Sequence, residues 1–154
     1  MLYAFFAAIA AALVAIFGKI GLGSIDSILA TAIRAIIMAA ITVAFAFSLG
    51  KFRGFTLGTL SGWAWLWIAL AGLAGAASWI FYFYALQTGP ATPVVAIDRL
   101  SLVFVLFLAA IFLGEAWSIK SAIGAGFMVV GAILISLRWE QIAEIGRYLS
   151  RLWQ

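Results

Sequence analysis

The stretch SILATAIRAIIMAAITVAFAFSL, residues 27–49, is a long apolar run that contains a single charged side chain, Arg34. A helix rises 1.5 Å per residue, so about 20 residues cross a hydrocarbon core of about 30 Å. In lipid the backbone polar groups must be satisfied within the segment, which requires a helix. Comparable runs cover residues 2–18, 63–86, 93–113 and 119–137. The sequence therefore predicts five transmembrane helices.

The composition agrees with a membrane protein. Of the 154 residues, 68% are hydrophobic and 9% are charged, whereas soluble domains are roughly half apolar and a quarter charged. The strict alternation of a transmembrane β-barrel is missing. The first run begins at Leu2 without a basic segment before it, so we interpret it as a span and not a signal peptide. We predict an all-α integral membrane protein with one membrane domain over residues 1–137.

The last residues, 138–154, differ from the spans. Their sequence is RWEQIAEIGRYLSRLWQ, in which large apolar residues recur at three- and four-residue spacing: Trp139, Ile142, Ile145, Leu149 and Leu152. This pattern predicts an amphipathic C-terminal helix lying in the headgroup region. The alternative is a frayed, solvated tail, which Gly146 would favour.

The residue types exclude several kinds of chemistry. Cysteine and histidine do not occur, and five acidic residues cannot supply both a metal cluster and a nucleophile–base pair. We therefore expect no enzyme, no catalytic residue, no metal and no cofactor. The net charge of +4 comes without a basic cluster, so we expect no nucleic acid partner and a membrane lipid environment.

Charged and polar residues inside the spans gather on one side of the membrane. We call the side that holds the N-terminus side A and the opposite side B. Arg34 lies about 12 Å along its helix from the side B end, and Asp98 about 8 Å. The candidate substrate-binding residues from this half are Lys19, Arg34, Gln87, Asp98 and Arg99.

Asp98 and Arg99 need different surroundings because neighbours in a helix point about 100° apart. We expect Asp98 to meet a cation from another helix, with Arg34 or Lys19 as candidates. Arg99 then remains for a loop carbonyl, a lipid phosphate or a substrate. Charged residues within a membrane usually face a water-filled pathway, which is the functional interpretation. The alternative is that these side chains only extend, or snorkel, to the headgroups.

Two aromatic residues of the third span complete the candidate site. Trp79 and Tyr82 share a helix face with Gly75 and Leu86, and Trp79 lies too deep for an interfacial belt. They either pack the helix bundle or form a cavity wall that contacts substrate by stacking or cation–π attraction.

The loop charges give no firm orientation. Side A has Lys51, Arg53 and Lys120, and side B has Lys19 and Arg138 before the basic residues of the tail. Such a near balance permits insertion both ways round.

Two segments carry a family resemblance: GKIGLGSIDSILATAIRA, residues 18–35, and ASWIFYFYALQTGPATPVVAIDRLSLVFVLFLAAIFLGE, residues 77–115. Together they resemble a single EamA-type repeat of the drug/metabolite transporter superfamily, in its five-helix branch. The matching features are FYFYAL, the Gly-Pro turn, Asp-Arg-Leu-Ser and FLGE.

The resemblance implies a secondary active transporter of the cell inner membrane for a small metabolite, amino-acid-like or drug substrate. It would work by alternating access as a homodimer, in which a second, antiparallel copy completes the pair of repeats. Asp98 would be the acidic candidate for a coupling ion. The alternatives are a flippase or flippase subunit for an anionic lipid, and a non-transporting membrane adaptor.

Overall fold

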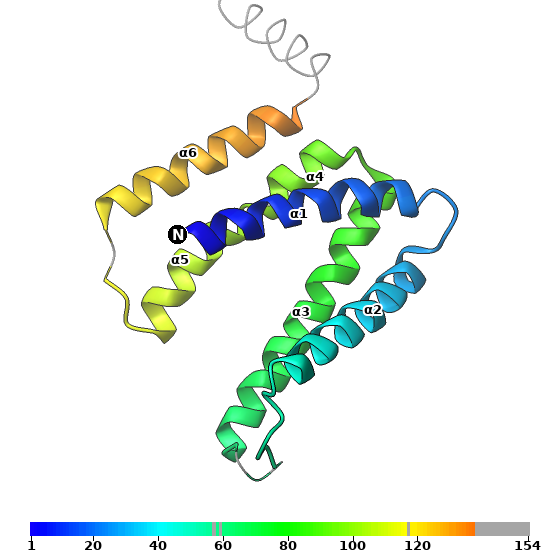
Figure 1. Cartoon of the computed structure of the whole chain (residues 1–154). Coiled ribbons are helices and arrows are strands. Elements are labelled where there is room, and N and C mark those ends of the chain that lie inside the picture. Colours follow the sequence, from blue (N-terminus) through cyan, green and yellow to red (C-terminus); the bar gives the residue numbers. More distant parts are fainter. Residues whose placement is uncertain (57, 59, 117, 138–154) are drawn as a thin grey trace, which may run out of the picture. The chain divides into compact units, whose positions relative to one another are not determined.

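A computed structural model describes residues 1–56, 58, 60–116 and 118–137. Within these residues the chain is helical and contains no strand (Figure 1). The helices are α1 (Leu2–Gly21), α2 (Ser27–Ser48), α3 (Gly62–Thr88), α4 (Ala91–Asp98), α5 (Ser101–Phe112) and α6 (Ile119–Ser136).

Five helical segments of the described chain are long and apolar enough to cross a membrane, with α4 and α5 together forming the fourth. The all-α membrane class and the predicted spans are therefore confirmed. The predicted amphipathic helix at 138–154 lies outside the described residues, so it stays a prediction.

The fourth span is interrupted at its charged residues. Helix α4 ends at Asp98 and α5 begins at Ser101. Arg99 keeps helical angles (φ −66°, ψ −13°), but the amide of Leu100 bonds the carbonyl of Ile97 at 2.9 Å, three residues back. This is the tighter bonding of a 3₁₀ turn, which often marks a mid-helix irregularity. The sequence predicted one uninterrupted run here, and the structure instead breaks it next to the Asp98–Arg99 pair.

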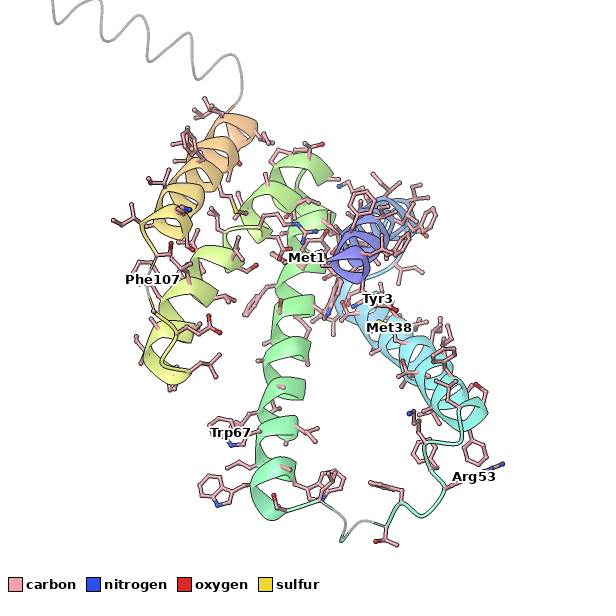
Figure 2. All side chains as sticks on the ribbon, turned by 60° about the vertical axis from the view of Figure 1, so that its left-hand side comes forward. Met1, Tyr3, Met38, Arg53, Trp67 and Phe107 are labelled. Atoms are coloured by element: carbon pink, nitrogen blue, oxygen red, sulfur yellow. The ribbon has the colours of Figure 1, made fainter. Side chains whose placement is uncertain are left out.

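The chain divides into two compact units, residues 1–88 and residues 89–154. In the first unit, α1 and α2 both pack against α3, and Figure 2 shows α2 diverging from α3 toward the C-terminal end of α2. The most buried side chains of this unit lie toward its side B end. They are Ala15, Leu22, Ser27, Thr31, Phe83 and Leu86.

The start of α2 is fixed by a side-chain cap. Asp26 accepts hydrogen bonds from the amides of Ile28 at 2.9 Å and Leu29 at 3.1 Å. Such a cap satisfies amides that have no partner within the helix. Ser24 and Asp26 are both residue types that cap helices, and the structure uses Asp26.

A glycine sets how closely α1 approaches α3. A Cβ atom added at Gly18 would lie 3.3 Å from Cζ of Phe83 and 3.7 Å from Cδ1 of Leu86. Both of these α3 side chains are almost fully buried. Small residues allow close approach of membrane helices, which associate by van der Waals packing. Gly18 therefore lets the largest buried side chains of this unit contact α1 directly.

The second unit is held together by α6, which packs against α4 and, less extensively, against α5. Among its described residues the buried side chains are small: Ala109, Ala125 and Ala132. Gly114, just after α5, has a φ of +65°, a left-handed conformation that glycine adopts without strain. This turn lets the chain reverse between α5 and α6.

Large apolar side chains cover the outside of the helices. In Figure 2, Trp67 projects from the part of α3 near its start, and it is 60% exposed. Trp63, at the same end of α3, is 70% exposed. Exposed tryptophans at one end of a span are typical of the membrane–water interface. The apolar exterior is the surface expected of a protein whose solvent is lipid.

Candidate functional site

The predicted residues Arg34 and Trp79 lie against each other in the first unit. The guanidinium carbon of Arg34, on α2, is 3.5 Å from the centre of the Trp79 ring, on α3. It is 5.0 Å from the centre of the Phe83 ring. Both distances are within the range of cation–π attraction, which is strongest with tryptophan and when water is excluded.

The three neighbouring rings of α3 support this arrangement. Trp79 meets Tyr82 edge to face, with ring centres 5.5 Å apart, and Phe83 at 5.9 Å. Tyr82 and Phe83 are 6.1 Å apart. Edge-to-face geometry of this kind is the favourable one for aromatic pairs. The ring under Arg34 is thus held from two sides, and Tyr82, also a predicted site residue, contacts the site through Trp79.

Arg34 and Trp79 line the larger of two grooves, which we call the α2–α3 groove. Its volume is about 920 Å³. Its walls are Ile28, Thr31, Ala32, Arg34, Ala35, Met38, Ala39, Thr42 and Val43 of α2, and Ile68, Gly72, Ala76, Trp79 and Ile80 of α3. Figure 2 shows Met38 on α2. Among these described wall residues, Arg34 is the only charged one.

Arg34 also lines a smaller groove of about 330 Å³. Its walls include Val14 and Gly18 of α1, Ile33 of α2 and Phe83 of α3. One guanidinium therefore borders two apolar grooves of the same unit. A single charge therefore lies at the wall of both grooves.

The hydrogen-bonding state of Arg34 is incomplete. Its Nε is buried and has no hydrogen-bond partner among the described residues. An unsatisfied buried donor is unfavourable, more so for a charged group. The N–H groups of arginine lie in the guanidinium plane and point toward a planar acceptor at its edge. Carboxylate and phosphate groups are the acceptors that match this edge.

Lys19 and Gln87 have backbone partners at the side B end of the first unit. The Nζ of Lys19 donates a hydrogen bond to the carbonyl of Leu86, and Nε2 of Gln87 donates to the carbonyl of Ile25 at 3.1 Å. A lysine near a helix C-terminus satisfies carbonyls that the helix leaves open. These contacts hold the end of α1 and the following loop against the end of α3. The substrate-binding role predicted for both residues stays a prediction.

Asp98 and Arg99 belong to the second unit, at the interruption between α4 and α5. Asp98 is half-buried and Arg99 is exposed. The two neighbours therefore differ in exposure, and the different partners expected for them stay a prediction. The expected partners of Asp98, Arg34 and Lys19, are in the first unit, so that pairing stays a prediction.

Sequence reasoning missed Phe83 as a part of the site. It follows Trp79 by four residues, the spacing that places two side chains on one helix face. That spacing could have identified it, but its contacts with Gly18 and Arg34 depend on how the helices pack and are not visible in the sequence. Thr31, which lines the α2–α3 groove and bonds the carbonyl of Ser27 at 2.7 Å, was also missed.

Five helical spans, together with a charged side chain bordering grooves within the membrane segment, define a multi-pass membrane protein of the transporter type.

Comparison with known proteins agrees. The model of the EamA-like transporter family matches residues 1–137. A curated relative from Sinorhizobium sp., named an uncharacterized transporter in the cobO 3′ region, is 36% identical over 135 residues. The match covers 88% of this chain and 94% of the relative. No solved structure matches. The chain belongs to the EamA-like transporter family.

Proposed function

We propose that this protein is a secondary active transporter of the inner membrane for small organic molecules that carry an anionic or zwitterionic group. The observation that carries the proposal is the position of Arg34, stacked on Trp79 at 3.5 Å and bordering both grooves of the first unit. A charge within a span is expensive unless it has a partner or a function. Its buried Nε without a partner among the described residues supports a ligand there.

The mechanism that fits a single five-span repeat is alternating access by two copies. Many transporters consist of two inverted repeats that rock about a site near the middle of the membrane. This chain supplies one repeat, and its loop charges are nearly balanced, with three on side A and two, Lys19 and Arg138, on side B when Arg147 and Arg151 are not counted. An antiparallel homodimer would supply the second repeat in the inverted orientation.

Asp98 is the acidic group that we propose for coupling. It is half-buried at the end of α4, next to the interruption of the fourth span. Irregular helix segments in transporters commonly lie where ions and substrates bind. If Asp98 binds a proton or cation during transport, Asp98→Asn will remove the dependence of uptake on an ion gradient while the substrate still binds.

Transport into proteoliposomes tests the proposal. Vesicles with the purified protein and empty vesicles receive a mixture of amino acids, organic acids and cationic drugs, with and without an imposed proton or sodium gradient. We expect gradient-dependent accumulation of at least one anionic or zwitterionic compound, abolished by an ionophore. Accumulation of cationic drugs alone would contradict the charge preference. No protein-dependent accumulation of any compound, over the whole mixture and with either proton or sodium gradients, would contradict transport.

A further inference from the structure

The α2–α3 groove is long. Its walls extend from Ile28 to Val43 on α2, about 22 Å along the helix, and from Ile68 to Ile80 on α3, about 18 Å. Figure 2 shows the two helices separating toward the C-terminal end of α2, so the groove opens in that direction. Its length suits an extended ligand better than a compact one.

The polarity of the groove is confined to one region. Arg34 is its charged wall residue among those described, and it lies about 14 Å from Val43 at the far end. The two wall threonines use their hydroxyl donors within α2, since Thr31 bonds the carbonyl of Ser27 at 2.7 Å and Thr42 that of Met38 at 2.7 Å. The remaining wall between Arg34 and Val43 therefore offers apolar contact and little else.

A ligand that complements this groove has one anionic group and one apolar chain. The anionic group would accept hydrogen bonds from N–H groups of the Arg34 guanidinium, whose carbon lies 3.5 Å from the centre of the Trp79 ring. The chain would lie between Met38 and Gly72 toward Val43, where it removes apolar surface from water or from mobile lipid. A compact hydrophilic anion would leave most of the groove unfilled.

We propose that the α2–α3 groove binds a single-chain anionic amphiphile, such as a medium-chain carboxylate, with its head on Arg34 and its chain along α2 and α3. This inference rests on the proposed transport function in one respect, because it takes the bound amphiphile to be the transported substrate. Binding itself needs neither a gradient nor turnover, so the two can be tested separately.

Photolabelling tests the proposal directly. The full chain, in nanodiscs of phosphatidylcholine, is incubated with decanoate that carries a diazirine at the end of its chain, then illuminated, and adducts are located by mass spectrometry. We expect adducts on the far walls of the groove, at Thr42, Val43 and Ile68. Unlabelled decanoate should compete for these sites, and the matching diazirine alcohol should label them weakly, since it lacks the charge.

Two variants test the head and the chain separately. Arg34→Gln removes the charge-assisted hydrogen bonds and should lower groove labelling roughly tenfold or more. Gly72→Leu leaves Arg34 in place and fills the groove; a Cβ atom at Gly72 meets no atom within 4 Å, so the substitution fits the fold. Gly75→Leu is its matched control, because Gly75 also has open space but does not line the groove. We expect labelling to be lost in Gly72→Leu and kept in Gly75→Leu.

Several results would overturn the proposal. Equal labelling by the alcohol, with adducts spread over the outer faces of all helices, would mean ordinary lipid contact. No adducts in the groove would mean that another part of the protein, or a second copy, covers it. Displacement of the probe by phosphatidylglycerol at an equal mole fraction would assign the groove to a two-chain membrane lipid. Groove labelling without gradient-driven uptake would support amphiphile binding and contradict the transport function. Gradient-driven uptake without groove labelling would support transport and contradict amphiphile binding in this groove.

Discussion

The guanidinium carbon of Arg34 lies 3.5 Å from the centre of the Trp79 ring, so a charge in the middle of one span rests on an aromatic side chain of another. These residues are far apart in the sequence, and α2 and α3 bring them together. The contact stabilises the cation without using its N–H donors, because it involves the ring face. This is a geometry for holding a charge in a membrane while leaving it available to a ligand.

Trp79 variants should show how much the cation–π contact with Arg34 contributes to substrate affinity. Trp79→Phe keeps an aromatic face but weakens the attraction, since tryptophan is the best partner. Trp79→Leu removes the attraction altogether, worth about 0.5–2 kcal/mol. We expect apparent affinity in the uptake assay to fall in the order wild type, Trp79→Phe, Trp79→Leu. Trp67→Leu, an exposed residue away from Arg34, is the control and should behave as wild type. Equal affinities for all four proteins would show that the stacking has no part in binding.

Gly18 should be intolerant of larger side chains. A Cβ atom there lies 3.3 Å from Phe83, so the methyl groups of Gly18→Leu would collide with two buried side chains of α3. Overpacking typically costs about 1–3 kcal/mol. We expect a lower thermal unfolding temperature in detergent for Gly18→Leu than for Gly21→Leu, since an added Cβ at Gly21 meets no atom within 4 Å. Equal unfolding temperatures would contradict the close α1–α3 contact.

An antiparallel dimer requires both membrane orientations in one population. Because the chain has no cysteine, a single one introduced at Gly58, in the exposed loop between α2 and α3, can be labelled alone. In intact cells a membrane-impermeant thiol reagent should modify about half of the protein if the two orientations are equally populated. Modification of nearly all or nearly none of it would exclude dual orientation and leave a parallel dimer or a different partner to complete the transporter.

Local features of the fold could be predicted from the sequence. The run at 27–49 corresponds to α2 at Ser27–Ser48, and Asp26 is the cap because a carboxylate just before an apolar run satisfies free amides. Both depend on neighbours in the chain. The interruption at Arg99 and Leu100 escaped prediction because hydropathy measures how apolar a run is and not how its backbone bonds are arranged.

The candidate site was predictable as a set of residues but not as an arrangement. Depth and charge identified Arg34, and depth identified Trp79, yet their contact depends on how α2 packs on α3. Lys19 and Gln87 were selected by the same reasoning, and they bond the carbonyls of Leu86 and Ile25. Sequence spacing does not reveal whether a polar side chain will meet a backbone carbonyl of another segment or remain available to a ligand.

Substitution of Arg34 in the uptake assay tests the central claim most directly. Proteoliposomes with wild type, Arg34→Lys, Arg34→Gln and Arg53→Gln are compared for gradient-driven uptake of the best substrate found, after insertion and monodispersity are shown to be equal. Arg53 is an exposed loop cation that lines neither groove. The account predicts wild-type uptake for Arg53→Gln, reduced uptake for Arg34→Lys because lysine keeps the charge but not the planar edge, and uptake at the level of empty vesicles for Arg34→Gln. Wild-type uptake by Arg34→Gln would contradict it.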